Sequence, residues 1–317
     1  MRWGAVIVAA GRGERFGGPK QLVDVAGRPL VAWSIAMFGS MPEIVDLVVA
    51  TEPEHAEAMR DLARRYAPRL EARVVHGGPT RQESVRLALA ALADRCSAVL
   101  VHDGARPLVL SVDVRAGMRV VRPGVASLLA QPVVDTIKVV DPGREVVMRT
   151  LDRATLWAAQ TPQFATVPDL RRAHADAHKH GVGATDDAAL LERAGLDVVV
   201  VRASNENFKV TAPADRERAE AILVARGALP VEEEEVLLVE AYVAGDTALS
   251  VARELEARRG RVDAIERDLP DAVVVRAFVP AEDLRGFGDR FAALAGASAI
   301  YTTHHAHYAP RPSEHAS

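Results

Sequence analysis

The feature that most constrains the fold is a regular alternation of apolar runs and helix-period segments across the first 225 of 317 residues. Strand-like runs occupy residues 5–10, 44–50, 71–77, 97–107, 125–133 and 197–201. Helix-like segments lie between or after them, at residues 30–38, 55–66, 81–93, 112–122, 167–179, 186–194 and 212–226. This alternation predicts a Rossmann-like α/β fold, a mostly parallel sheet with helices on both faces. Such sheets bind ligands at the carboxyl ends of their strands.

Residues 133–153 interrupt this alternation. Two β-rich runs there flank a Pro142-Gly143 turn, which is a hairpin signal. We expect a β-hairpin that protrudes from the sheet. It is either an edge feature of one chain or an arm that meets another subunit.

A second domain is predicted after residue 227. Residues 228–235 contain a proline and four consecutive glutamates and are interpreted as a linker. Strands are expected at 236–243, 261–268, 272–280 and 297–305, and helices at 246–260 and 282–296. The order β-α-β-β-α-β predicts an α+β ferredoxin-like domain over residues 236–309. Residues 310–317 are predicted to be a disordered tail.

Composition narrows the class of protein. Hydrophobic residues make up 49% and charged residues 26%, with a net charge of −4, as in ordinary globular proteins. The charge gives no reason to expect nucleic-acid binding. The single cysteine, Cys96, excludes an internal disulfide, and a small core residue is its expected role. A single cysteine fits the reducing cytoplasm, where we expect the protein. No apolar run approaches the ~20 residues that span a bilayer, so we expect no membrane contact.

A glycine-rich turn, AAGRGERFGGPKQ, follows the first strand at residues 9–21. Gly11 and Gly13 let backbone N–H groups approach a ligand closely. Positive charge at the same turn comes from three side chains: Arg12, Arg15 and Lys20. Donors and cations together suit a triphosphate, although the spacing matches neither Walker A nor GxGxxG.

Only four of the 39 basic residues are lysines. This low share fits a GC-rich genome or a hot habitat, or a need for compact ammonium groups where lysine is kept.

The stretch GAVIVAAGRGERFGGPKQ (4–21) resembles the opening of the sugar-nucleotidyltransferase superfamily, and more closely the 2-C-methyl-D-erythritol 4-phosphate cytidylyltransferase family. The likeness continues, in the family's order over about residues 3–226, through GGPTRQESV (77–85), VHDGARP (101–107), DTIKVV (135–140), TLDRATLWAAQTPQFA (150–165), TDDAALLERAG (185–195) and NFKVTAPAD (207–215). It implies transfer of CMP from CTP to methylerythritol phosphate, with release of pyrophosphate. The product, 4-diphosphocytidyl-2-C-methyl-D-erythritol, belongs to the non-mevalonate isoprenoid route.

The resemblance also implies roles for individual residues. Three cations would act on the triphosphate: Arg15, Lys20 and Lys209. The nucleotide would be bound by Ala9, Ala10, Gly11, Gly13, Gly78, Arg81 and Ser84. The sugar-alcohol phosphate would be bound by Arg106, Thr136, Arg153 and Thr161. Asp103 would face Mg²⁺, or another divalent cation, since Mg²⁺ prefers carboxylate and phosphate oxygens. Some relatives carry an acidic residue where this chain has Pro79.

The family resemblance further implies a homodimer through the arm, with Thr136 and Arg153 binding substrate in the neighbour's site. The alternative is an edge hairpin with a surface arginine. Residues 236–309 resemble the C-terminal ferredoxin-like domain of elongation factor G. The chain has no P-loop, so GTP hydrolysis is not implied. We interpret this domain as an appended spacer or oligomer contact, with ribosome or RNA binding as the rival.

Two other functions stay open on sequence alone. Ribitol-5-phosphate cytidylyltransferases share the glycine-rich loop and general plan. A ribosome-associated or RNA-associated protein with a residual nucleotide site is the rival from another class. His174, His178 and His180 include an i, i+4 pair, but an exposed polar helix face is preferred over a zinc site.

Overall fold

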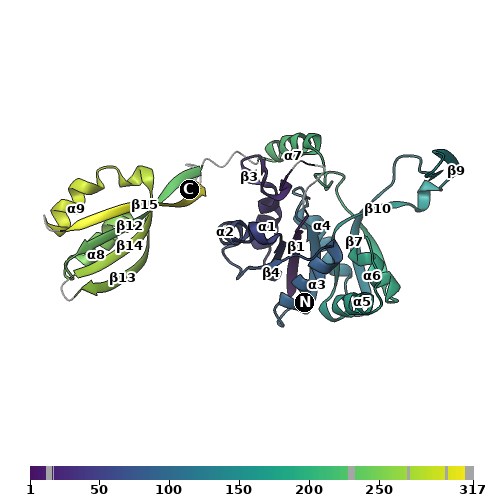
Figure 1. The fold of residues 1–317 in the computed structure, drawn as a ribbon, viewed down its shortest axis with the longest axis horizontal. Helices are drawn as coiled ribbons and strands as arrows, with labels where there is room; N and C mark the ends of the chain where they lie inside the picture. The colour runs from purple at the N-terminus through teal and green to yellow at the C-terminus, as the bar shows by residue number, and fades with distance from the viewer. Residues whose placement is uncertain (12–15, 17, 228–232, 270–271, 297–298, 311–317) are drawn as a thin grey trace. The chain divides into compact units, whose positions relative to one another are not determined.

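The computed structural model describes residues 1–11, 16, 18–227, 233–269, 272–296 and 299–310. Contacts divide the chain into two compact units, Met1–Leu229 and Pro230–Ser317 (Figure 1). Each unit is described by itself below. Among the described residues, no helix combines the length and the apolar character needed to cross a membrane.

A seven-stranded sheet in the order β11-β7-β10-β6-β1-β4-β5 forms the centre of the first unit. Its strands are β1 (Trp3–Ala9), β4 (Ile44–Thr51), β5 (Arg73–His76), β6 (Ala98–Asp103), β7 (Val125–Pro132), β10 (Trp157–Thr166) and β11 (Asp197–Arg202). Neighbouring strands run parallel except that β10 is antiparallel to β6 and to β7. The predicted mostly parallel α/β sheet is therefore confirmed, whereas β10 was not anticipated.

Helices cover both faces of this sheet because its strands are apolar on both sides. The helices are α1 (Leu30–Ser40), α2 (Ala56–Tyr66), α3 (Arg81–Ala91), α4 (Ser111–Val120), α5 (Val167–Lys179), α6 (Asp187–Arg193) and α7 (Pro213–Ala225). Residues of α1, α2 and α4 pack in one buried cluster with Ile7 of β1. Residues of α3, α5 and α6 pack in another with Val6, the neighbouring residue that points to the opposite face.

The strand order places a topological switch point beside β1. From β1 the chain moves outward to β4 and β5, and α3 then returns it to β6 on the other side of β1. Val8 of β1 is paired with Asp103 of β6, and Ala9 with Thr51 of β4. Ligands of open α/β sheets bind at such a point, outside the carboxyl ends of the strands.

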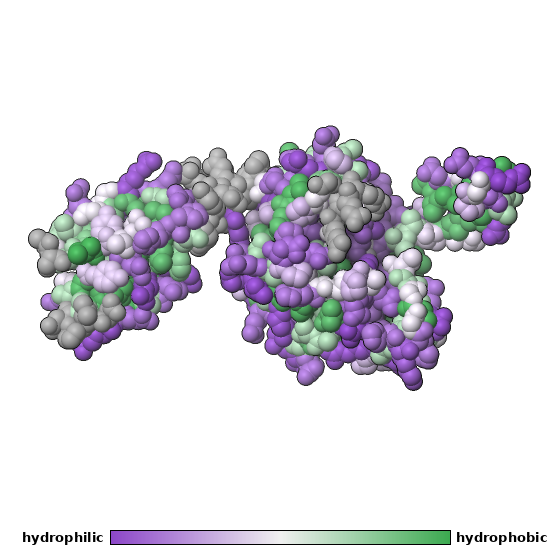
Figure 2. All heavy atoms as spheres, in the orientation of Figure 1, coloured by the Kyte–Doolittle hydropathy of each residue, from purple (hydrophilic) through white to green (hydrophobic). Residues whose placement is uncertain are grey.

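The predicted hairpin is present as an arm, which we define as residues 133–156. Its strands β8 (Lys138–Asp141) and β9 (Val146–Thr150) pair only with each other among the described strands. A short helix, η4 (Arg153–Thr155), follows. The arm exposes large apolar side chains, with Val134 80% and Met148 68% exposed. Green spheres mark this apolar surface at the right of Figure 2.

Smaller elements complete the first unit. The ribbon of β2 (Asp24–Val25) and β3 (Arg28–Pro29) follows η2 (Lys20–Leu22), and η3 (Pro53–His55) precedes α2. Leu223 of α7 packs with Leu108 in a separate buried cluster. Cys96 is buried and has no disulfide partner, as predicted.

The second unit has the predicted ferredoxin-like α+β fold. Its elements are β12 (Glu233–Val243), α8 (Ala248–Ala257), β13 (Arg261–Leu269), β14 (Ala272–Pro280), η5 (Ala281–Leu284), α9 (Phe287–Ala295) and β15 (Ile300–Pro310). The antiparallel sheet has the order β13-β14-β12-β15, and its core holds Leu255 of α8 and Phe291 of α9. β12 begins at Glu233, so the last glutamates of the expected linker belong to a strand. Residues 228–232 and 311–317 lie outside the described residues.

Candidate active site

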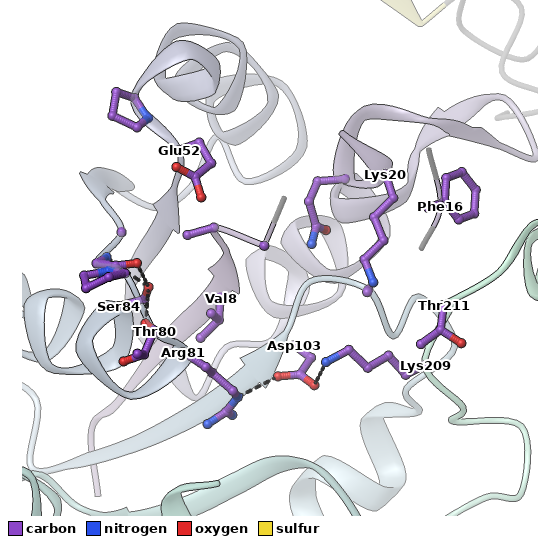
Figure 3. Close-up of a pocket in the computed structure, with 18 residues that line it drawn as sticks. Val8, Phe16, Lys20, Glu52, Thr80, Arg81, Ser84, Asp103, Lys209 and Thr211 are labelled. Atoms are coloured by element: carbon purple, nitrogen blue, oxygen red, sulfur yellow. Dashed lines mark hydrogen bonds and ion pairs between the residues drawn. The ribbon is translucent and has the colours of Figure 1, made fainter. Parts of the chain in front are cut away.

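A cavity of about 780 Å³ opens at the switch point, at the carboxyl ends of β1, β4, β5 and β6 (Figure 3). Its walls include most of the nucleotide-binding and cationic residues predicted from sequence, and the predicted metal ligand. These are Ala10, Gly11, Lys20, Gly78, Arg81, Ser84, Asp103 and Lys209. The volume is in the range of small-molecule sites. The structure therefore brings together residues that are up to 199 positions apart, from Ala10 to Lys209.

Two lysines and one carboxylate line the end of the cavity nearest β6. Lys20 is 9% exposed, and its Nζ donates a hydrogen bond to the Val210 carbonyl at 3.1 Å. Lys209 Nζ lies 2.9 Å from Asp103 Oδ2. Lys20 lies early and Lys209 late in the sequence of the first unit. The hydrogen bond from Lys20 to the carbonyl of Val210, the residue after Lys209, brings both lysines to one part of the cavity wall. Two lysine ammonium groups in one part of the cavity wall can bind phosphate oxygens.

Asp103 is held by cations on both of its oxygens. Arg81 Nε lies 3.0 Å from Oδ1, opposite Lys209 on Oδ2. Burial alone would raise the Asp103 pKa, but the charges of Arg81 and Lys209 outweigh burial and hold that pKa well below its usual range. Asp103 is therefore a carboxylate at neutral pH, and its charge is balanced locally.

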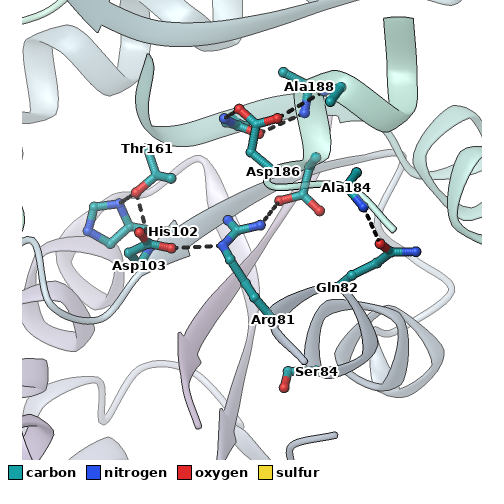
Figure 4. Close-up of polar contacts among 12 residues, drawn as sticks. Arg81, Gln82, Ser84, His102, Asp103, Thr161, Ala184, Asp186 and Ala188 are labelled. Atoms are coloured by element: carbon teal, nitrogen blue, oxygen red, sulfur yellow. Dashed lines mark hydrogen bonds and ion pairs between the residues drawn. The ribbon is translucent and has the colours of Figure 1, made fainter. Parts of the chain in front are cut away.

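Arg81 is oriented by a buried carboxylate beyond the cavity. Its Nη1 lies 2.8 Å from Asp187 Oδ2, and His174 Nε2 lies 2.9 Å from the other oxygen, Oδ1. Figure 4 shows Arg81 between Asp103 and the helix that begins at Asp187. His174 is 1% exposed, so the expected exposed polar face is wrong for this residue. Its partner lies on a different helix, which helix periodicity alone does not show.

A second set of buried polar groups holds Asp103 and its neighbours in place by hydrogen bonds. The Asp103 N–H donates to Thr161 Oγ1 at 3.0 Å. His102 Nε2 lies 3.1 Å from the Arg106 carbonyl, which only accepts, so Nδ1 accepts from the Thr161 hydroxyl at 3.1 Å. Burial lowers the pKa of His102 to about 4, which keeps its ring neutral. The guanidinium of Arg106 donates to the Asn207 carbonyl at 2.8 Å.

The described contacts of Thr161 and Arg106 are internal, and their expected binding of the sugar-alcohol phosphate stays a prediction. Neither is among the residues that line the cavity, and both make internal hydrogen bonds. Thr161 positions Asp103, and Arg106 fastens the segment that carries Lys209.

The opposite side of the cavity is formed by the loop between β5 and α3. Thr80 caps α3 by accepting the Glu83 N–H at 3.1 Å. Ser84 is 1% exposed, accepts the Gly78 N–H at 3.1 Å and lies 2.9 Å from the Thr80 carbonyl. The hydroxyl expected to contact the nucleoside is therefore engaged within the protein. A Cβ on Gly77 would come within 2.2 Å of the Ala10 Cβ, so glycine allows this loop to approach the turn after β1.

Not every predicted site residue is among the described residues that line the cavity. Arg15 and Gly13 fall outside the described residues. Ala9 is buried in the core at the end of β1 and does not line the cavity. Thr136 and Arg153 are exposed on the arm, where Arg153 Nη1 donates to the Val134 carbonyl at 2.7 Å.

Sequence reasoning missed three residues of the site. Glu52 lines the cavity directly after β4, and its signal was its place at the carboxyl end of an apolar run. Asp187 binds Arg81 on the side away from the cavity, and His174 binds Asp187. No local sequence pattern connects these residues.

A mixed sheet with a switch-point cavity, lysines and a balanced carboxylate defines a nucleotide-binding α/β protein of the nucleotidyltransferase class. The family model described as 2-C-methyl-D-erythritol 4-phosphate cytidylyltransferase matches residues 4–225. The chain belongs to this family and is an enzyme of the nucleotidyltransferase class. A second model, described as elongation factor G C-terminus, matches residues 233–317.

Individual relatives agree with this assignment. The 2-C-methyl-D-erythritol 4-phosphate cytidylyltransferase of Prochlorococcus marinus (strain MIT 9313) is 43% identical over 224 residues, 70% of this chain and 98% of the relative. That of Gloeobacter violaceus is 43% identical over 69% of this chain and 94% of the relative. The solved enzyme from Thermus thermophilus has a TM-score of 0.56 and 33% identity, covering 70% of this chain and 98% of its own. The 4-diphosphocytidyl-2C-methyl-D-erythritol synthase of Anaerococcus prevotii has a TM-score of 0.61 and 26% identity over 70% and 98%.

Proposed function

We propose that the first unit transfers CMP from CTP to 2-C-methyl-D-erythritol 4-phosphate, releasing pyrophosphate and forming 4-diphosphocytidyl-2-C-methyl-D-erythritol. The observation that carries the proposal is the convergence of Lys20, Lys209 and Asp103 in one cavity of a chain that belongs to this family. In the same proposal, the product serves non-mevalonate isoprenoid biosynthesis.

The chemistry needs positioning and charge stabilisation more than a protein nucleophile. An oxygen of the acceptor phosphate attacks the α-phosphorus of CTP and forms a new P–O bond. The bond from the α-phosphorus to the bridging oxygen breaks, and the electron pair leaves with pyrophosphate. Lys20, Lys209 and Arg15 carry the positive charge that stabilises the negative charge growing on the phosphate oxygens.

Mg²⁺ is the metal we assign to this reaction. Among the described residues no group of three or more His, Cys, Asp or Glu side chains could hold an ion by itself. A single carboxylate, Asp103, at the triphosphate end of the cavity fits an ion that also uses phosphate oxygens. Bound there, the ion would neutralise triphosphate charge, and another divalent cation with oxygen preference would serve equally.

The arm supports a homodimer in which each subunit completes the other's site. Exposed apolar side chains on a two-stranded ribbon are unfavourable in water, and packing against a second chain would bury them. Thr136 and Arg153 would then bind the sugar-alcohol phosphate of the neighbouring subunit. A cytoplasmic location belongs to the same proposal.

Pyrophosphate release from CTP and Mg²⁺ tests the function. Methylerythritol phosphate and ribitol 5-phosphate should be compared as acceptors with the full chain. Release with the first acceptor alone supports the proposal, and release with the second alone assigns the chain another acceptor. If folded protein releases no pyrophosphate with either acceptor, the proposal is contradicted.

A further inference from the structure

Glu52 is a carboxylate in the wall of a cavity that is otherwise built for an anion. It follows the last residue of β4, Thr51, and lines the cavity with Pro53. Figure 3 shows its carboxylate turned toward the cavity, on the side of Thr80 and Ser84 and away from Lys20 and Lys209. A like-charged group in an anion site is unfavourable unless it meets a part of the ligand that carries no negative charge.

The two acidic groups of the cavity differ in their partners. Asp103 is balanced by Arg81 and Lys209. The side chain of Glu52 makes no hydrogen bond or ion pair within the described part of the chain. A carboxylate only accepts hydrogen bonds, and Glu52 therefore has acceptor capacity for a donor on the ligand.

The order of the strands indicates which part of the ligand lies beside Glu52. The cavity runs across the ends of β6, β1, β4 and β5, in that order. Asp103 ends β6, and Lys20 and Lys209 lie at the same end, which is the place of the triphosphate. Glu52 follows β4, whose last residue is paired with Ala9 on one side and with His76 on the other. With strands about 4.8 Å apart, Glu52 lies roughly 10 Å along the row from Asp103, beyond the reach of the α-phosphate.

The residues expected to bind the nucleoside do not supply a free side-chain acceptor on this side of the cavity, and Glu52 can supply one. The Ser84 hydroxyl and the Gly78 N–H are hydrogen-bonded to each other, and Pro79 has neither a side-chain acceptor nor an N–H. Glu52 thus supplies the side-chain carboxyl group on this side of the cavity within the described residues. Cytidine offers two kinds of donor there, the exocyclic amine of the base and the ribose hydroxyls. Uridine replaces the amine with a carbonyl, which a carboxylate repels.

We propose that the Glu52 carboxylate accepts a hydrogen bond from the nucleoside half of CTP and thereby contributes to the choice of nucleotide. The inference rests on the proposed function for the identity of the nucleotide. It assigns specificity to a side chain that takes no part in the bond-forming step.

The test compares Glu52→Ala and Glu52→Gln with Glu54→Gln, a matched control two residues away that is exposed and outside the cavity wall. We would measure kcat/KM for CTP, UTP, 2′-deoxy-CTP and 3′-deoxy-CTP. Glu52→Ala should lower the value for CTP about tenfold, the effect of losing a hydrogen bond to a charged group. Glu54→Gln should leave all four values unchanged.

The analogues identify the donor. If the donor is the base amine, kcat/KM for UTP should not fall, and the ratio of kcat/KM for CTP to that for UTP should decrease. The decrease should be largest in Glu52→Gln, whose amide can donate to the uracil carbonyl. If the donor is a ribose hydroxyl, kcat/KM should fall equally for CTP and UTP, and it should not fall for the deoxy analogue that lacks this hydroxyl. No loss with CTP, or an equal loss with all four nucleotides, overturns the proposal. If the wild-type chain releases no pyrophosphate, the proposed function fails, and calorimetric binding of the same nucleotides still decides the role of Glu52.

Discussion

Arg81 and Asp187 form a buried ion pair, with Nη1 and Oδ2 2.8 Å apart, that ties the first turn of α3 to the first turn of α6. The same guanidinium uses Nε to hold Asp103. Burial alone would raise the Asp187 pKa, but the charge of Arg81 and the hydrogen bond from His174 hold that pKa below its usual value. A carboxylate outside the cavity thus fixes the direction of a cation inside it.

We expect Asp187→Asn to weaken CTP use as well as the fold. Losing one partner of a buried pair should lower the free energy of unfolding by about 3 kcal/mol. Losing the group that orients Arg81 should lower kcat/KM for CTP roughly 10- to 100-fold. Urea denaturation and steady-state kinetics measure the two effects. In the Arg81→Ala background the substitution should leave CTP affinity unchanged.

The neighbouring Asp186→Asn is the control for Asp187→Asn. Asp186 caps α6 by accepting the Ala189 N–H at 3.0 Å and makes no contact with Arg81. Asn caps helices about as well as Asp, so the substitution should cost less than about 1 kcal/mol of stability, with no change in KM for CTP. Equal kinetic losses in both variants would show that Asp187 acts only on the fold.

Lys20→Ala should lose most activity without unfolding the first unit. A cation that stabilises transition-state charge contributes about 10²- to 10³-fold to kcat. Lys179→Ala, at the exposed end of α5, is the matched control and should retain full turnover. Undiminished turnover in Lys20→Ala would remove this residue from the mechanism, and a thermal melt separates loss of charge from loss of fold.

His102 should make the protein less stable below neutral pH. Its pKa in the fold is about 4, below the ordinary value of 6.5, mainly because the ring is buried. The unfolded chain therefore binds the proton more readily, and stability that is complete above about pH 6.5 is lost as the pH falls toward 4. The free energy of unfolding should drop by roughly 2 kcal/mol between about pH 7.5 and about pH 5 from this residue.

Denaturation of wild type and His102→Gln at both pH values checks this expectation. The variant should be less stable at neutral pH but should show a smaller drop on acidification. Asp103 and Asp187 have lowered pKa values, so their contributions are kept until the pH falls below about 4. The same drop in both proteins would contradict the assignment to His102.

How much of this structure the sequence predicts depends on the range of the interaction. The alternation of apolar runs is local, and it predicts the strands and helices that bring Asp103 and the glycine-rich turn to one edge. β10 was missed because its placement between β6 and β7 is decided by pairing with distant strands, not by its own pattern. The sequence around His174 predicts an exposed face for the same reason, since the contact of His174 with Asp187 on another helix is not visible in the local pattern.

Removal of residues 228–317 should leave the transferase reaction largely intact. Every described residue that lines the cavity lies between Val8 and Thr211. The second unit has its own core, which includes Val239, Val251 and Phe287, so the first unit does not need it for folding. We expect kcat and KM within roughly twofold of the full chain. A folded but inactive truncation would place the second unit in the site or in the dimer.

The arm can be tested by mixing two inactive variants. If each arm reaches the neighbouring subunit, every site combines Lys20 from one chain with Arg153 from the other. A heterodimer of Lys20→Ala and Arg153→Ala chains then contains one site with both changes and one site with neither. Statistical exchange in an equal mixture should restore roughly a quarter of wild-type activity, since half the dimers are mixed and half their sites are intact. If Arg153 serves its own chain, every site keeps one defect, and co-refolded mixtures will be no more active than the average of the two variants.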